Sequence, residues 1–256
     1  MQVATLDREF AALFEAYYQR VFARTMTADP HLHRVIPVGK TIRADYEIQP
    51  YESAAEIIEN SRAWGVADCI CRKQKALVGD PCDHPVDVCI WLSSVGGIFD
   101  NDPKVRVVSK EEALKTLERA ADAGLIHSTA NNQQNIRYIC NCCTCSCGFL
   151  RGIADLGIAN VMARSAFVCK VDAEVCLACE GCIEYCQFGA LEMDGSSVSV
   201  DPQRCVGCGV CVRNCSEDAL ALVRRPESDI KPVPANEAVW GSERAANRGL
   251  TGNPPR

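Results

Sequence analysis

Eight cysteines of this chain fall into two runs with identical spacing, which suits them to bind metal. The first run is Cys176-x2-Cys179-x2-Cys182-x3-Cys186, and the second is Cys205-x2-Cys208-x2-Cys211-x3-Cys215. Each cysteine of the first run has a counterpart 29 residues later, so the segment is an internal repeat of one structural unit. The chain has 18 Cys in 256 residues, yet it is too long to resemble small disulfide-stapled scaffolds. Metal binding is therefore the first expectation for these thiols.

The spacing is typical of sites for [4Fe–4S] clusters, in which three thiolates come from one tight loop and the fourth comes from the other run. The small residues Ala178, Gly181, Gly207 and Gly209 let backbone N–H groups approach the sulfurs. The alternative metal is zinc, for which paired C-x2-C units separated by a spacer are usual. The rule predicts two clusters, cluster 1 on Cys176, Cys179, Cys182 and Cys215, and cluster 2 on Cys205, Cys208, Cys211 and Cys186.

Two such loops joined by a hairpin resemble the two-[4Fe–4S] bacterial-type ferredoxins. Asp194-Gly195 between the runs indicates the hairpin turn, and the resemblance covers residues 165–223. It implies a ferredoxin-like fold and electron transfer for this part of the chain. The chain departs from the family pattern at Gln187 and Ser216, which stand where Pro usually follows the fourth Cys. Either polar side chain is expected to hydrogen-bond a sulfur, and Ser216 is suited to cap the next helix, so ligation should survive.

Ten cysteines lie outside the two runs. Cys169, alone in a predicted strand, is expected to be a small buried apolar residue. Cys69 and Cys71 share one face of a predicted strand, and Cys82 and Cys89 flank the start of a predicted helix. These two pairs are expected to converge on a third cluster. Five more thiols follow within eight residues. The candidate ligands of one or two further clusters are Cys69, Cys71, Cys82, Cys89, Cys140, Cys142, Cys143, Cys145 and Cys147.

Spacing alone leaves the nature of this second set open. One shared site, two separate sites, a structural zinc and thiols without metal all fit it. The pattern CICR, followed much later by CNCCTCSCG, is similar to N-terminal regions of uncharacterised bacterial 4Fe–4S binding proteins. Arg72 and Lys73 either offset the negative charge of a cluster or are solvated surface charges. Among the four His, His84 is the one next to a cysteine group.

Periodicity and capping patterns predict the helices that position these residues. Apolar residues at three- and four-residue steps predict an amphipathic helix over residues 6–24 that packs on a core or a partner. Ser53-Ala-Ala-Glu56 is a capping box for a helix that continues to Trp64-Gly65. Ser109-Lys-Glu-Glu112 is a second capping box, for a helix that ends at Gly124.

A short strand is predicted over residues 66–71, and a helix is predicted to begin near Pro85. Together these elements predict the α+β class. The expected organisation is a Cys-rich mixed domain over 1–147, a linker helix over 148–164, the ferredoxin-like domain over 165–223 and a Pro-rich extended tail over 224–256.

Composition and missing motifs exclude several functions. The net charge of −6 argues against nucleic acid as a partner, because binding phosphates needs a basic face. The sequence has no apolar stretch long enough for a membrane span and no secretory signal pattern, which favours the cytoplasm. It also has no GxGxxG, and Gly39-Lys40-Thr41 lacks the upstream Gly of a phosphate-binding loop, so no flavin or nucleotide site is expected.

The leading hypothesis is an electron-transfer protein or subunit that relays single electrons through [4Fe–4S] clusters between redox protein partners, a donor and an acceptor oxidoreductase. Two alternatives stay open. One is a catalytic subunit whose N-terminal cluster has an open, substrate-binding iron. The other is a redox or oxygen sensor built on the N-terminal cysteines.

Overall fold

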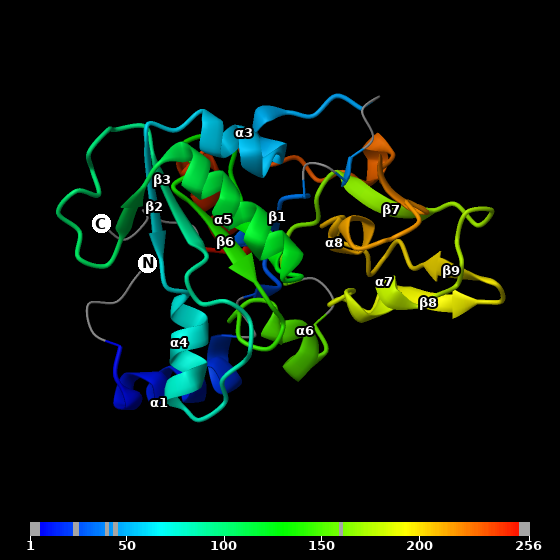
Figure 1. Ribbon diagram of the computed structural model, residues 1–256. Helices are drawn as coiled ribbons and strands as arrows, with labels where there is room; N and C mark the ends of the chain where they lie inside the picture. Colours follow the sequence, from blue (N-terminus) through cyan, green and yellow to red (C-terminus); the bar gives the residue numbers. More distant parts are fainter. Residues whose placement is uncertain (1–5, 23–25, 39–40, 43–45, 159–160, 251–256) are drawn as a thin grey trace.

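An antiparallel six-stranded sheet organises the N-terminal half of the protein in the computed structural model (Figure 1). The structure describes residues 6–22, 26–38, 41–42, 46–158 and 161–250. Helices together with antiparallel sheets confirm the α+β class. The sheet order is β1-β5-β6-β3-β2-β4, with β1 (His33–Val35), β2 (Ala63–Ala67), β3 (Cys89–Ser93), β4 (Arg106–Val108), β5 (Ile126–Ala130) and β6 (Tyr138–Cys142).

Short helices surround this sheet, and two smaller sheets complete the fold. The longer helices are α1 (Arg8–Tyr17), α3 (Ala54–Glu59), α4 (Ile70–Leu77), α5 (Lys110–Asp122), α6 (Arg151–Leu156) and α9 (Glu237–Asn247). The C-terminal elements are β7 (Phe167–Val171), α7 (Gly181–Glu184), β8 (Leu191–Asp194), β9 (Ser197–Val200), α8 (Val210–Arg213) and β10 (Leu220–Arg224). Single turns of π or 3-10 helix lie at Tyr18–Phe22, Pro50–Glu52 and Glu227–Asp229.

Side-chain alternation along β3 and β6 gives the large sheet one apolar face and one face that carries cysteines. Ile90, Leu92 and Ile139 belong to the buried core beneath α3 and α5. Cys89 and Cys140 alternate with these residues, so they point to the opposite face. The thiols therefore gather on the face of the sheet opposite α3 and α5.

The C-terminal segment pairs β7 with β10 and β8 with β9, both antiparallel. The hairpin predicted at Asp194-Gly195 is confirmed, because Asp194 pairs with Ser197 and Gly195 has a φ of 63°. Both small sheets lie beside the large sheet in Figure 1. One buried core joins the two halves, since it includes Ile126 of β5 and Leu222 of β10.

The helix predicted from Ser109 is confirmed as α5. The Ser109 hydroxyl accepts from the Glu112 N–H at 3.2 Å, and the Glu112 carboxylate accepts from the Ser109 N–H at 3.1 Å. The helix predicted from Ser53 is shorter than expected and is capped at Asn60. Trp64 lies in β2 instead, because pairing with β3 and β4 outweighs the local pattern.

Two local predictions around the N-terminal cysteines are wrong. The strand predicted over 66–71 ends at Ala67, and Cys69 caps α4, which also contains Cys71. The helix predicted near Pro85 is absent from this described segment, where Cys89 begins strand β3. Pairing of β3 with β2 and β6 decides both cases, because sheet contacts far apart in sequence override weak local signals.

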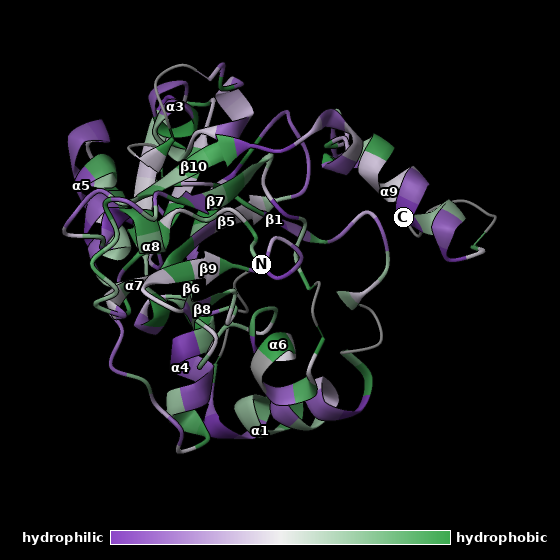
Figure 2. Ribbon diagram, turned by 90° about the vertical axis from the view of Figure 1, so that its right-hand side faces the viewer, coloured by the Kyte–Doolittle hydropathy of each residue, from purple (hydrophilic) through white to green (hydrophobic). Residues whose placement is uncertain are grey.

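The two ends of the described chain also differ from expectation. Helix α1 begins after the Asp7 cap, and residues 23–24 of the predicted helix lie outside the described residues. Part of its apolar stripe faces solvent, since Leu13 is 63% exposed. The tail predicted to be extended contains α9, which lies at the rim in Figure 2 and whose Trp240 indole donates to the His31 carbonyl at 2.9 Å. Among the described residues, no helix has the length and apolar character of a membrane span.

Candidate metal centres

The two C-terminal cysteine runs share backbone conformation as well as spacing. Three positions in the first repeat unit have positive φ, and each has a counterpart with positive φ 29 residues later. The pairs are Ala178 with Gly207, Glu180 with Gly209, and Gly189 with Asp218. Positive φ is ordinary for Gly but uncommon for Ala and Glu. The two loops therefore have the same backbone conformation. Glu180 takes the place of Gly209 in the first loop, which its residue type did not predict.

The fold brings cysteines of the two runs together across the repeat. Burial raises the pKa of Cys182 to about 11, and the charges of Cys211, Cys215 and Cys176 add to this rise. Burial likewise raises the pKa of Cys208, with charges that include Cys205 and Cys186. The fourth cysteine of each run thus lies near the other run, which is the arrangement that two four-thiolate clusters need.

Backbone N–H groups surround the sulfurs of the second site. The Ala190 N–H donates to Cys186 Sγ at 3.3 Å, and the Cys169 N–H donates to Cys205 Sγ at 3.4 Å. Cys169 is buried, and its own Sγ lies 3.8 Å from Cys211 Sγ. Such donors stabilise thiolates, so the residues present fit a cluster bound by anionic sulfur. Cys169 is therefore a neighbour of this site rather than an isolated apolar residue.

Exposure distinguishes the two C-terminal sites. Cys179 is exposed, and Val175 and Leu177, which flank Cys176, are 43% and 68% exposed. Cys205 and Cys211 are buried. The first site therefore faces solvent with an apolar rim, whereas the second lies inside the protein.

The structure divides the nine N-terminal candidate ligands into two sets. Six of them are close neighbours whose thiols shift one another's pKa values in pairs that close a ring, and we call them the six-thiol group. The links run from Cys69 to Cys71, Cys147, Cys142, Cys140, Cys89 and back to Cys69. Sheet geometry explains the ring, because Cys140 and Cys142 share one face of β6 and Cys89 lies on the adjacent strand β3.

Thiol contacts within the six-thiol group shift its pKa values in opposite directions. Hydrogen bonds from Cys71 and Cys89 lower the pKa of Cys69 to about 2. Hydrogen bonds to Cys147 and Cys69, together with burial, raise the pKa of Cys71 well above its usual value. Each thiolate opposes ionisation of its neighbours, whereas bound metal ions allow several thiolates to coexist. The group is therefore chemically suited to a multinuclear cluster.

A buried cation lies beside the six-thiol group and beside Cys143, and its charge helps to lower the pKa of Cys69. Arg72 is only 3% exposed, and its Nη2 donates to the Asn141 carbonyl at 2.9 Å and to Cys143 Sγ at 3.5 Å. Its Nε and Nη1 atoms are buried without a hydrogen-bond partner. Lys73, by contrast, is half exposed and pairs with Asp68. Of the two basic residues beside Cys71, Arg72 is the one placed to offset negative charge on sulfur.

The other three N-terminal ligands lie around His84. Cys82, His84, Cys143 and Cys145 place their ligand atoms within 4.8 Å of one another, and we call them the Cys3His group. Burial raises the pKa of Cys143, but a hydrogen bond from His84 and the charge of Arg72 outweigh it and lower the value to about 6. Cys82 and Cys89, which were expected to act together, therefore belong to different groups. His84 was not among the predicted ligands, although its place beside Cys82 was a signal.

The predicted hydrogen bond from the Gln187 side chain to a sulfur is wrong. Its side-chain amide makes hydrogen bonds to Gly124 and Thr144 of the N-terminal half. Ser216 bonds its neighbour Glu217, also without a sulfur contact. Gln187 thus connects the end of the first cysteine run to the turn that carries Cys143 and Cys145.

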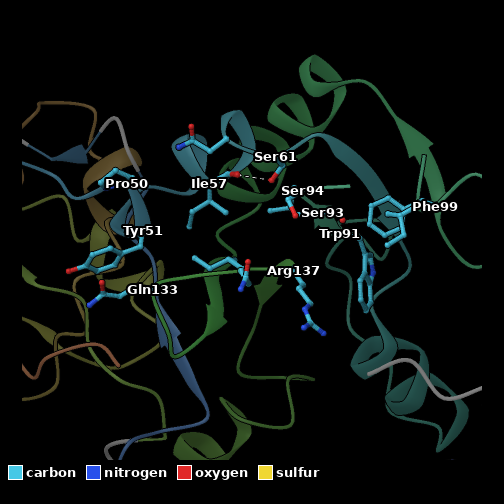
Figure 3. A pocket seen from close by; sticks show the side chains of 15 residues that line it. Pro50, Tyr51, Ile57, Ser61, Trp91, Ser93, Ser94, Phe99, Gln133 and Arg137 are labelled. Atoms are coloured by element: carbon cyan, nitrogen blue, oxygen red, sulfur yellow. Dashed lines mark hydrogen bonds between the residues drawn. The ribbon is translucent and has the colours of Figure 1, made fainter. Parts of the chain in front are cut away.

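A pocket of about 580 Å³ lies beside strand β3, away from these groups. Figure 3 shows Trp91 and Phe99 on one side of it, Tyr51 on the other and Arg137 between them. The described residues that line it include no cysteine. The metal chemistry and this pocket are therefore separate features.

Comparison with known families matches residues 197–220 to a 4Fe–4S binding domain. This segment contains Cys205, Cys208, Cys211 and Cys215. No curated protein matches the chain. The match and the N–H donors around the sulfurs agree on the same chemistry, so the chain carries at least one iron–sulfur cluster.

Proposed function

We propose that this iron–sulfur protein relays single electrons through two C-terminal [4Fe–4S] clusters to a partner oxidoreductase in the cytoplasm. The observation that carries the proposal is the repeated loop, with the same spacing and the same positive-φ positions in both cysteine runs. Bound clusters supply one-electron redox chemistry, while the protein supplies burial, hydrogen bonds and spacing. A ferredoxin-like domain over residues 165–223, with cluster 1 on Cys176, Cys179, Cys182 and Cys215 and cluster 2 on Cys205, Cys208, Cys211 and Cys186, is part of this proposal.

Exposure supports a direction for the relay. Cluster 1 lies at the surface, and Val175, Leu177 and Tyr185 form an exposed apolar rim on its loop and the helix that follows. Apolar groups around a solvent-facing redox site are suited to transient contact with a redox protein. We place the exchange of electrons with the partner at this rim.

The six-thiol group extends the relay into the N-terminal half. Six thiols exceed the four that a [4Fe–4S] cluster uses, so a third cluster here does not require an open iron position. This observation favours electron transfer over the alternative of a substrate-binding cluster. Gln187, which follows a ligand of cluster 2, bonds the turn that precedes Cys147 of the six-thiol group. The two redox regions are thereby held at a fixed separation.

Iron and sulfide analysis of anaerobically prepared full-length protein, followed by EPR of the reduced protein, tests this function. Two clusters require about eight iron per chain, and a third raises the number to about twelve. The expected preparation also transfers electrons from dithionite to a small redox protein acceptor. About four iron or fewer, or two clusters that are never reduced, contradicts the relay.

The variant Leu177→Asp should slow electron transfer to a protein acceptor and leave reduction of the clusters by dithionite unchanged. The control is Val107→Asp, a change at another exposed apolar residue.

A further inference from the structure

The Cys3His group has the dimensions of a site for a single metal ion. Its four ligand atoms all lie within 4.8 Å of one another, and Cys145 Sγ is 3.5 Å from His84 Nδ1. A tetrahedral zinc ion with Zn–S bonds of about 2.3 Å and Zn–N bonds of about 2.0 Å separates its ligand atoms by about 3.5 to 3.8 Å. A cubane instead spreads its four thiolates over four iron corners. The close packing of these atoms therefore matches one ion rather than a cluster.

We propose that Cys82, His84, Cys143 and Cys145 bind one structural Zn²⁺, separate from the iron–sulfur clusters. Cys3His is an established donor set for structural zinc, and protein ligands fill all four positions of the tetrahedron. The spacing also sets this group apart from the two C-terminal cysteine runs. Both pairs, Cys82-x-His84 and Cys143-x-Cys145, have one intervening residue, whereas cysteines in the C-terminal runs are separated by two or three.

The surroundings of the group are those of an anionic metal site. Three thiolates and one Zn²⁺ carry a net charge of about −1. The buried Arg72 donates to Cys143 Sγ at 3.5 Å, and two further nitrogen atoms of its guanidinium are buried without a partner. The Ser146 hydroxyl donates to Cys82 Sγ at 3.2 Å. A buried cation and an added donor both stabilise sulfur that carries negative charge.

The ion would join two segments that are far apart in the sequence. Cys82 and His84 lie in the loop between α4 and β3, whereas Cys143 and Cys145 lie in the turn after β6. That turn also contains Thr144, which Gln187 holds through a hydrogen bond. Zinc would thus fix the loop that leads into Cys89 and the turn that leads into Cys147, both of the six-thiol group. Its role is to position the redox ligands, since a filled tetrahedron leaves no place for a substrate.

Metal analysis of the full-length protein, expressed anaerobically with both iron and zinc supplied, tests the site. We expect one zinc per chain and a zinc-edge X-ray absorption spectrum that fits three sulfur ligands and one nitrogen. The variants His84→Ala and Cys145→Ser should lose most of the zinc and retain the iron of the C-terminal clusters. Cys179→Ser, a change at cluster 1, should lower iron and leave zinc unchanged. His84→Cys should retain zinc with a shell of four sulfurs, which separates ligation from a general loss of folding.

Three results would overturn the proposal. The first is zinc far below one per chain in protein with a full iron content. The second is a loss of zinc in Cys179→Ser equal to that in Cys145→Ser, which would mean that zinc occupies cluster sites. The third is an unchanged zinc shell in His84→Cys. The first and third results do not bear on the relay through the C-terminal clusters, because that function is measured by iron, sulfide and EPR.

Discussion

The side-chain carbonyl of Gln187 accepts a hydrogen bond from the backbone N–H of Thr144 at 2.7 Å, and its amide donates to the Gly124 carbonyl at 2.6 Å. The residue directly after Cys186 is thereby tied to the turn between Cys143 and Cys145. Proline cannot make either bond, so a polar residue at this position connects the two halves of the protein. This connection fixes the geometry between the C-terminal cysteine runs and the N-terminal thiols.

Substitution of Gln187 should weaken that connection without removing a ligand. We expect Gln187→Ala to lower the free energy of unfolding by about 1 to 3 kcal/mol, because a backbone donor and acceptor lose their partners. Iron content should stay at the wild-type level. Anaerobic urea unfolding measures the difference, with exposed Gln203→Ala as the control. Equal stability of the two variants would show that the bond is unimportant.

Serine substitutions should reveal how the C-terminal cysteines divide between the clusters. If the fourth cysteine of each run binds the other cluster, Cys215→Ser and Cys176→Ser perturb the same EPR signal. Cys186→Ser and Cys208→Ser then perturb the other signal. EPR of each reduced variant at matched iron content makes the comparison. Pairing of Cys215 with Cys208 would contradict the ligand sets proposed here.

Removal of the buried cation should make an N-terminal cluster harder to reduce. Reduction adds negative charge, so loss of the Arg72 guanidinium disfavours the reduced state and lowers the reduction potential. We expect Arg72→Met to lower one potential by roughly 60 mV, a tenfold change in a one-electron equilibrium. EPR-monitored redox titration measures this shift. Lys73→Met, a change at a half-exposed residue, should have little effect, and equal shifts in both variants would exclude a specific role for Arg72.

Glycine should be favoured at Glu180 and required at Gly209. Glu180 has a φ of 63°, so Glu180→Gly should stabilise the first loop by about 1 kcal/mol. Gly209 has a φ of 78°, and a Cβ there would collide with the Thr41 side chain, so Gly209→Ala should destabilise the protein by about 2 kcal/mol or more. Thermal unfolding under anaerobic conditions compares both variants with wild type. A stabilising Gly209→Ala would refute the shared loop conformation.

The ion pair that anchors α1 should contribute a defined pH dependence. The Arg151 guanidinium binds the Glu15 carboxylate with two hydrogen bonds, of 2.8 and 2.6 Å, and lowers the pKa of Glu15 from 4.5 to about 2. A carboxyl whose pKa is lower in the folded state stabilises the protein above its unfolded pKa. This stabilisation is lost as the pH falls from about 4.5 towards about 2.

We therefore expect Glu15→Gln to cost about 1 to 2 kcal/mol after allowance for solvent screening. The cost should be constant from about pH 5 to pH 8 and should shrink only at lower pH. Anaerobic urea unfolding at several pH values measures it. Glu9→Gln, on the exposed side of α1, is the control. A cost that changes between pH 6 and pH 8 would mean that another group is responsible.

The sequence by itself determined the chemistry of the C-terminal half. Tight loops impose their geometry locally, so regular spacing and a 29-residue offset were enough to predict two loops of one conformation, an iron–sulfur site and the hairpin at Asp194-Gly195. The capping box at Ser109 was equally local, and α5 begins there.

The tertiary structure decided which N-terminal thiols act together. Cys89 joins Cys140 because β3 pairs with β6, and Cys82 joins His84 and Cys145 because a loop meets a turn about 60 residues away. The sequence also did not predict that Arg72 is buried while the adjacent Lys73 is half exposed. Contacts between distant segments depend on sheet register and packing, which spacing along the chain does not encode.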